Sequence, residues 1–356
     1  MKLIQQWLQQ RVSDTQLMML LATLLTILVL ILSLGDVLAP VFFAIALAYV
    51  LDGIVQLLVR LKVPHLVAVA VVCMGAMLIV LFALLAVLPL LSEQVVRLVQ
   101  HIPDDVERLK QAIHDVQLHS AAWMNPEHVQ QMMASATTKV QEWGAMLLSL
   151  SFSRLPGLMV LMVYAVLVPV LVFFLLKDKT VILTWGKKFL PRERSLLGRV
   201  WLELDTQIGN YIRGRFWESF MVGLVMWLCY LWMGHQYALL LGVLTGISVW
   251  LPFIGAALVT VPVIFLSFFQ WGASDMTLYA ILAYGVIQLI DANVVIPWLF
   301  SEVVNLHPIA IIVAVLFFGS VWGALGVFLA IPLAALIQSV LLIIAERSLL
   351  IEDKTE

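Results

Sequence analysis

Eight long apolar stretches constrain this chain more than any other feature of its sequence. They cover residues 17–35, 37–59, 66–91, 155–176, 217–233, 238–269, 277–299 and 308–345. A helix needs about 20 apolar residues to cross the hydrocarbon core of a bilayer, and hydrophobic residues make up 63% of the chain. None of the stretches alternates as the strands of a membrane barrel do. The sequence therefore predicts an all-α, polytopic helical membrane bundle with about eight apolar segments, two of them broken or re-entrant.

Lysine and arginine residues predict how this bundle is oriented. Nine of them fall within residues 177–215, whereas residues 92–153 carry four against seven acids. Basic loops remain on the cytoplasmic side of a membrane, so we expect both termini inside and residues 92–153 outside. A tight turn at Gly35-Asp36 is expected between the first two spans.

Changes in composition along the chain predict six segments. In order they are N-terminal membrane helices (1–91), an extracytoplasmic helical insertion (92–153), a membrane helix (154–179), a cytoplasmic amphipathic helix (180–216), a C-terminal membrane core (217–345) and a cytoplasmic tail (346–356). The amphipathic segment carries an apolar stripe that includes Trp201 and Tyr211, and basic residues lie mostly elsewhere. Such a stripe predicts a helix in the membrane interface that favours anionic headgroups.

Two of the apolar stretches, 238–269 and 308–345, are too long for ordinary single spans. Each contains Ser-Val-Trp, starting at Ser248 and Ser320, followed by a glycine and then a proline. Each stretch can cross the membrane with a kink or fold back as a re-entrant hairpin. Paired interrupted segments indicate a transport site, whereas the alternative interpretation is close helix packing through glycine.

A polar group interrupts the apolar stretch 277–299. Gln288, Asp291 and Asn293 stand there among apolar residues, and an aspartate at the membrane centre costs about 2.5–3.5 kcal/mol unless it faces protein or water. Pro297 lacks the N–H that would bond the carbonyl of Asn293. We expect Asp291 to contact an ion or a solute, and a buried hydrogen-bond network between helices is the alternative.

Prolines in the broken stretches extend this predicted pathway, since Pro252 removes the helical partner of the Ser248 carbonyl. The predicted substrate or ion pathway comprises Asp291, Asn293, Gln288, Pro297, Ser248, Pro252, Gly255, Gly319, Gly323 and Gly326.

Enzymatic and metal-dependent functions find no support in the sequence. It contains no His-Glu-x-x-His helix, no Gly-x-Ser-x-Gly turn and no phosphate-binding Gly-x-x-x-x-Gly-Lys loop. Four histidines lie in the outer insertion, but none sits four residues from another, so no shared helix face holds a metal; they are His101, His114, His119 and His128. Cys73 and Cys229 fall inside apolar stretches as small hydrophobes. We expect no cofactor, no metal and no nucleic-acid partner.

Several motifs resemble the C-terminal signature of the autoinducer-2 exporter family. The matching stretches are Gln288-Leu-Ile-Asp-Ala-Asn293, Pro297, Phe300-Ser-Glu-Val-Val-Asn-Leu-His-Pro308, Phe318-Gly-Ser-Val-Trp-Gly-Ala-Leu-Gly326 and Ala330-Ile-Pro332, with Tyr211-Ile-Arg-Gly214 and Leu251-Pro-Phe-Ile-Gly255 in support. Within that family the chain is most similar to the PerM-type permeases. The resemblance covers nearly the whole chain. It implies a bacterial inner-membrane transporter that forms homo-oligomers.

The expected function is that of a secondary transporter or permease. The resemblance implies export of a small hydrophilic solute such as autoinducer-2, or exchange of monovalent cations for protons as an antiporter. The expected partners are the lipid membrane, that solute or cation, and further copies of the chain. A membrane scaffold or regulatory protein that transports nothing is the alternative, and in that case Asp291 has a purely structural role.

Overall fold

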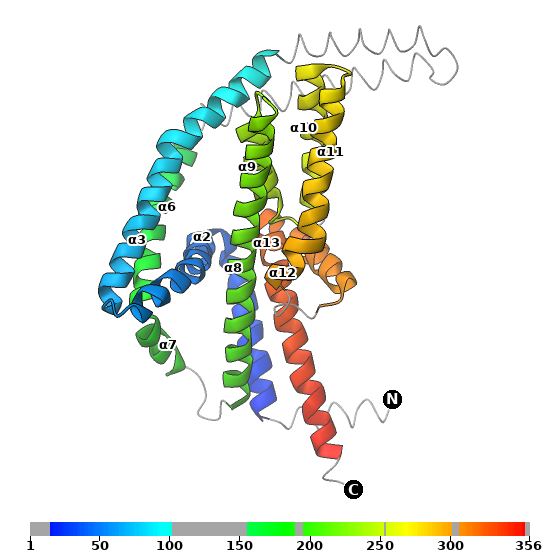
Figure 1. Ribbon diagram of the computed structural model, residues 1–356. Helices are drawn as coiled ribbons and strands as arrows, with labels where there is room; N and C mark the ends of the chain where they lie inside the picture. Colours follow the sequence, from blue (N-terminus) through cyan, green and yellow to red (C-terminus); the bar gives the residue numbers. More distant parts are fainter. Residues whose placement is uncertain (1–14, 102–154, 189–194, 253, 301–305, 353–356) are drawn as a thin grey trace. The chain divides into compact units, whose positions relative to one another are not determined.

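The computed structural model describes residues 15–101, 155–188, 195–252, 254–300 and 306–352. Every element within these ranges is a helix, which confirms the predicted all-helical membrane fold (Figure 1). The elements are α2 (Thr15–Arg60), α3 (His65–Phe82), η1 (Ala83–Val87), α6 (Leu155–Lys177), α7 (Lys179–Lys187), α8 (Ser195–Trp232), α9 (Ala238–Ser248), α10 (Ile254–Trp271), α11 (Asp275–Ile290), η2 (Asp291–Val295), α12 (Ile296–Phe300) and α13 (Pro308–Glu352). The η elements are π-helical.

Four helices in the described ranges are long and apolar enough to cross a membrane. They are Leu38–Arg60, His65–His101, Ile254–Trp271 and Asp275–Phe300. Shorter apolar helices cover Val163–Lys177, Ala238–Ser248, Ile309–Gly323 and Gly326–Ser339. The second long helix continues to His101 through the predicted start of the outer insertion at residue 92. The predicted helical hairpin of that insertion otherwise lies outside the described residues.

Helix α2 corrects the turn predicted at Gly35-Asp36. Both residues lie inside one continuous helix, which also contains Pro40. A glycine in a helix costs only about 1 kcal/mol, whereas a turn in apolar surroundings leaves several backbone groups unbonded at several kcal/mol each. A Gly-Asp pair that marks a turn in water is therefore compatible with a helix here.

The described chain forms two compact units. Unit 1 comprises Met1–Ala76, Tyr164–Phe216 and Pro297–Glu356, and unit 2 comprises Met77–Val163 and Trp217–Ile296. In unit 1, small and branched residues of α2, α3 and α6 form one core cluster: Ala44, Ala48, Leu51, Val55, Ala68, Val69, Val72, Val172 and Leu176. The alanines four residues apart on α2 let its neighbours approach closely, which is how helices associate without a hydrophobic driving force.

The core of unit 2 joins four helices, α8, α9, α10 and α11. Its buried members are Met226, Tyr230, Tyr237, Ala238, Leu241, Val259, Val263, Leu266, Ala280 and Tyr284. Tyr230 carries a polar group into this core, and its hydroxyl donates a 2.9 Å hydrogen bond to the carbonyl of Ala280. Because buried hydroxyls need such partners, this bond fixes α8 beside α11.

Helix α8 shows which part of the stripe predicted for residues 180–216 is covered by protein. The helix runs from Ser195 to Trp232 without a break, and residues of the predicted interfacial stripe turn inward. Tyr211 and Ile212 are buried with Val50 of α2 and Ile331 of α13. The Tyr211 end of the apolar stripe therefore packs on protein in unit 1, whereas Trp201 near its other end is exposed. An apolar stripe suits a helix neighbour as well as a headgroup boundary.

Candidate functional site

The stretch 238–269 is a helix–turn–helix rather than one kinked span. Helix α9 holds only 11 residues, and α10 packs back on it within the same core cluster. A Cβ atom built on Gly255 would lie 1.8 Å from the carbonyl oxygen of Ser248. Only glycine therefore fits where α10 starts, because the two backbones touch there. We call this pair of helices hairpin 1.

The stretch 308–345 folds back in the same way. Gly323, inside α13, has φ 59° and ψ −135°, a conformation that residues with side chains rarely adopt. Ala314 and Val315 before this point pack with Ala330 and Ala334 after it. A Cβ on Gly326 would lie 1.8 Å from the carbonyl oxygen of Phe318. Residues 309–339 thus form hairpin 2, and Figure 1 shows α13 changing direction sharply.

Other glycines support the alternative interpretation, in which glycine serves helix packing. Ser219 and Gly223 of α8 face Gly242 and Gly246 of α9. A Cβ built on Gly223 would lie 3.2 Å from the Gly246 Cα atom, and a Cβ built on Gly246 would lie 2.8 Å from the Ser219 carbonyl oxygen. The Ser219 hydroxyl donates a 2.7 Å hydrogen bond to the Gly246 carbonyl. Two small residues four apart on each helix give this contact. Glycine therefore serves both purposes in unit 2.

Asp291 is the buried polar centre of the predicted pathway. Only 7% of the surface of Asp291 is accessible to solvent. Asp291 is the first residue of the π-helix η2, in which the Ile296 N–H donates a hydrogen bond to the Asp291 carbonyl. Single π-helical turns within α-helices occur frequently at functional sites. Asn293 is exposed and its amide donates 2.8 Å back to the Leu289 carbonyl. Gln288 is half-buried, and Pro297 is exposed.

One carbonyl group differs from the prediction. The Ser248 carbonyl accepts a 2.9 Å hydrogen bond from the Leu251 N–H in the turn of hairpin 1, so the missing donor at Pro252 does not leave it unbonded. It retains a second lone pair.

Hairpin 1 and Asp291 are linked through Tyr284. The Tyr284 hydroxyl donates a 2.6 Å hydrogen bond to the carbonyl of Ala256, next to Gly255. Asp291 follows seven residues later, about 10 Å further along the helix axis at 1.5 Å per residue. Because α10 and α11 run antiparallel, Asp291 lies toward the turn of hairpin 1. Buried Thr245 and Ser248 add hydroxyl groups to α9.

The ten predicted pathway residues divide between the two units. Unit 2 holds Gln288, Asp291, Asn293, Ser248, Pro252 and Gly255, whereas unit 1 holds Pro297, Gly319, Gly323 and Gly326. The structure brings the first group to one side of unit 2, around hairpin 1 and the π-helix. Gly319 and Gly326 belong to the tip of hairpin 2, where a Cβ on Gly319 would meet Val327 at 2.9 Å.

Sequence reasoning missed two buried charged residues on α8. Glu218 is 1% exposed and Arg215 is 9% exposed. The Arg215 guanidinium lies 5.6 Å from the ring centre of Tyr211 and 5.1 Å from that of Phe300, distances at which a cation is attracted to aromatic faces. Their position at the start of the apolar stretch 217–233 could have indicated that these charges are buried. Charged residues at that position are also typical of an ordinary membrane boundary.

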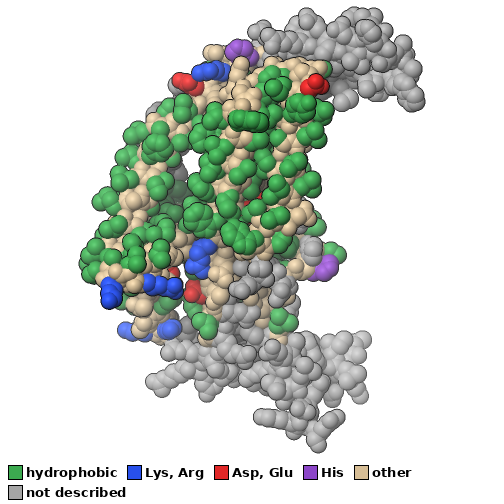
Figure 2. Space-filling view, in the orientation of Figure 1, with side chains coloured by type: hydrophobic (Ala, Val, Ile, Leu, Met, Phe, Trp, Pro, Cys, Tyr) green, Lys and Arg blue, Asp and Glu red, His purple; other side chains and the backbone are tan. Residues whose placement is uncertain are grey.

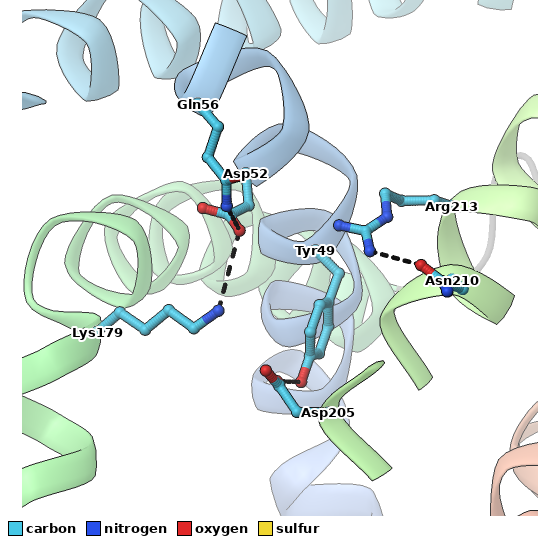
Figure 3. A network of polar contacts seen from close by, with 7 residues as sticks. All are labelled: Tyr49, Asp52, Gln56, Lys179, Asp205, Asn210 and Arg213. Atoms are coloured by element: carbon cyan, nitrogen blue, oxygen red, sulfur yellow. Dashed lines mark hydrogen bonds and ion pairs between the residues drawn. The ribbon is translucent and has the colours of Figure 1, made fainter. Parts of the chain in front are cut away.

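A polar network links α2, α7 and α8 in unit 1 (Figure 3). Tyr49 donates a 2.5 Å hydrogen bond to Asp205 Oδ1, and the Lys179 Nζ atom lies 3.9 Å from Asp52 Oδ2. Gln56 also donates to Asp52, at 2.8 Å. This network is how the structure accommodates Asp52 and Gln56 within the apolar helix α2.

A buried histidine closes the far end of hairpin 1. His235 lies in the turn between α8 and α9. Its ring stacks on that of Tyr230, with ring centres 5.2 Å apart, and meets the Trp271 ring edge-on at 5.0 Å. Its Nδ1 atom accepts a 3.0 Å hydrogen bond from the Tyr237 N–H, and its Nε2 atom lies 3.4 Å from the Ser267 hydroxyl. Burial lowers the pKa of His235 to about 4, because an apolar environment disfavours the charged form.

No group of three His, Cys, Asp or Glu side chains in the described ranges is arranged to hold a metal. Among the four histidines of the predicted insertion, His101 lies on the described helix, where its Nδ1 contacts the Arg97 carbonyl at 2.7 Å. The other three lie outside the described residues. The candidate site is therefore an arrangement of one carboxylate, hydroxyls and backbone carbonyls.

Comparison with known proteins agrees with a membrane transporter. The model of the AI-2E family transporter matches residues 17–346. The candidate permease PerM of Escherichia coli (strain K12) is 38% identical over 341 residues, which are 96% of this chain and 97% of that protein. The candidate transport protein YueF of Bacillus subtilis (strain 168) is 26% identical over 84% of this chain and 82% of its own.

A relative with a substrate in its name is more distant. The AI-2 transport protein TqsA of Escherichia coli (strain K12) is 21% identical over 85% of each chain. The family model and the long match to PerM place almost every described element, including both hairpins and the π-helix, within the shared region. The chain belongs to the AI-2E family of transporters.

Proposed function

We propose that this chain is a secondary transporter that moves a small hydrophilic solute past Asp291 and the turn of hairpin 1. The observation that carries the proposal is a buried carboxylate on a π-helix, two helical turns from the bond between Tyr284 and Ala256 at the start of α10. Broken helices expose backbone carbonyls where only protein or a water-filled path can satisfy them. Paired broken segments are how transporter folds build a site within the membrane.

The chemistry of this region suits a solute with hydroxyl groups. A carboxylate accepts hydrogen bonds strongly, and the hydroxyls of buried Thr245 and Ser248 together with backbone carbonyls add further partners. The name of TqsA gives autoinducer-2 as its substrate, so a solute of that class is the first to test. We also propose that the chain lies in a bacterial inner membrane with both termini in the cytoplasm. In this proposal it forms homo-oligomers and exports its solute from the cell.

The experiment compares solute flux in proteoliposomes for the native chain, Asp291→Asn and Asp275→Asn. Asp275 is an exposed aspartate at the start of the same helix, so it provides a matched control. We expect Asp291→Asn to reduce flux about tenfold or more, because a hydrogen bond to a charged group contributes about 1.5–3 kcal/mol. Asp275→Asn should retain native flux.

Coupling to a cation gradient is tested in the same vesicles. A buried carboxylate that binds a proton or a monovalent cation makes solute flux depend on that gradient. We expect native flux to respond to an imposed proton or sodium gradient and the residual flux of Asp291→Asn not to respond. Equal flux of all three proteins would make Asp291 structural in a transporter, whereas no flux of any tested solute by the folded native chain would support the alternative scaffold function.

A further inference from the structure

Helix α7 is held at the end of a membrane helix and yet exposes an apolar surface. It starts at Lys179, and only Asp178 separates it from the end of α6 at Lys177. The Asp178 N–H donates to the Phe174 carbonyl at 2.8 Å, and the Ile182 N–H donates to the Asp178 carbonyl at 2.9 Å. These bonds continue the backbone from one helix to the next. Because α6 is apolar from Val163 to Lys177, α7 begins at the level where a bilayer's hydrocarbon ends.

The side chains of α7 divide into two faces. Val181, Ile182 and Trp185 are all exposed, with 64%, 40% and 61% of their surface accessible. At about 100° per residue these three share one face. Thr180 and Lys187 fall on the opposite face, and both are exposed. A short helix of this kind is typical of one that lies in the membrane interface.

Basic residues flank this apolar face. Lys177 precedes α7, Lys187 ends it and Lys188 follows it, and all three are exposed. The adjacent acid, Asp178, lies 3.7 Å from the Lys177 amine, which leaves a positive balance at the other end of the helix. Figure 2 shows lysine and arginine side chains gathered at this end of unit 1.

We infer that α7 is a binding surface for anionic lipid, with Val181, Ile182 and Trp185 in the acyl boundary and Lys187 and Lys188 on the headgroups. The apolar face alone would bind any bilayer, whereas the lysines add attraction to anionic headgroups. This inference is independent of what the chain transports. It also moves the lipid contact predicted for the amphipathic segment from its longer helix to its short one.

The test measures the depth of a spin label on α7 in the full-length chain. Cys73 and Cys229 are replaced by alanine, and a single cysteine is placed by Ile182→Cys or, on the opposite face, by Thr180→Cys. The protein is reconstituted in nanodiscs of phosphatidylcholine with or without phosphatidylglycerol. We expect the label at 182 to lie about 5–10 Å below the headgroups in anionic discs, accessible to oxygen and protected from an aqueous nickel complex. The label at 180 should show the reverse.

The lysines are tested by Lys187→Gln with Lys188→Gln in the Ile182→Cys background. We expect this double substitution to move the label outward in anionic discs and to leave its depth unchanged in zwitterionic discs. For the unsubstituted lysines, 0.5 M salt should have the same effect, since it shortens the screening length to a few ångströms. This salt measurement requires no further substitution and therefore stands even if the double variant fails to assemble.

Three results would overturn the inference. A label at 182 that neither oxygen nor nickel reaches is covered by protein, which would make α7 a protein contact. A label that nickel reaches as easily at 182 as at 180 lies in water. A depth that is the same in both kinds of disc and at both salt concentrations shows that the lysines do not select anionic lipid.

Discussion

The two hairpins share a backbone device and differ in what surrounds it. In each, a glycine presses against a carbonyl seven or eight residues earlier, Gly255 on Ser248 and Gly326 on Phe318, with the same 1.8 Å distance for an added Cβ. Hairpin 1 has hydroxyl groups near its turn, and Tyr284 donates to the start of α10. Hairpin 2 carries the equivalent serine, Ser320, whose hydroxyl donates to the Phe317 carbonyl as that of Ser248 donates to the Thr245 carbonyl. Its buried cluster consists of alanine, valine and Phe318, with the Phe318 and Trp322 rings stacked.

This difference indicates that the same fold-back serves two purposes. A broken helix needs close backbone contact wherever it occurs, so the glycines are common to both hairpins. Contact with a hydrophilic solute additionally needs polar side chains, and in unit 2 the Tyr284 hydroxyl and the buried Asp291 add to those of hairpin 1. We therefore expect the backbone changes to affect both hairpins equally and the polar changes to affect hairpin 1 alone.

The largest effect is expected from Gly255→Ala and Gly326→Ala. Each new methyl group would overlap a backbone carbonyl that no rotamer change can move, so each should lower the free energy of unfolding by at least about 3 kcal/mol. Thermal unfolding in detergent and the yield of monodisperse protein measure this. Gly285→Ala is the control, because a Cβ there meets nothing within 4 Å. An effect of only one of the two changes would contradict a shared device.

The repeated motif could be predicted from the sequence, but the way each segment breaks could not. Ser-Val-Trp followed by glycine and proline identified both broken segments, and their length indicated that neither is an ordinary straight span. Whether each stretch kinks or folds back depends on tertiary contacts, such as Ala314 and Val315 packing on Ala330 and Ala334. Local sequence cannot encode such contacts, because a glycine permits a sharp break without requiring one.

Burial at the candidate site was partly predictable. The cost of a charge in a membrane indicated that Asp291 would face protein, and it is buried. The same reasoning was not applied to Arg215 and Glu218, which stand at the start of an apolar stretch and are buried as well. The sequence shows whether a charged residue lies in the middle or at the end of an apolar stretch. Whether a charged residue at an end is buried depends on which helices pack against it, and the sequence does not show that.

Acidification should have an intermediate effect on the free energy of unfolding, through a histidine that packs on hairpin 1. His235, which caps the far end of hairpin 1, has a pKa lowered to about 4, against about 6.5 in an unfolded chain. Between these values the unfolded chain binds more protons, so stability is retained above pH 6.5 and lost as the pH falls toward 4. The loss should reach roughly 3 kcal/mol, at 1.36 kcal/mol for each pKa unit.

The comparison that isolates this histidine uses His235→Gln, whose side chain does not titrate in this range. Thermal unfolding midpoints are measured for both proteins from pH 7 to pH 4.5. We expect the variant to be less stable at pH 7, because it loses the ring contacts with Tyr230 and Trp271, and to show a smaller decrease on acidification. Parallel decreases in the two proteins would assign the pH dependence to other groups.

The smallest effect is expected from Tyr284→Phe, which removes only the hydroxyl that binds the Ala256 carbonyl in hairpin 1. Loss of one such bond should cost about 0.5–1.5 kcal/mol, and thermal unfolding measures it against Tyr279→Phe, a change at an exposed tyrosine of the same helix.

Solute flux provides the sharper readout. If the turn of hairpin 1 lines the path, loosening α10 from α11 should change flux by more than this small loss of stability explains, because the position of the Ser248 and Ala256 backbone depends on that bond. A variant with native flux and slightly reduced stability would limit Tyr284 to packing and would leave Asp291 as the polar group on which transport depends.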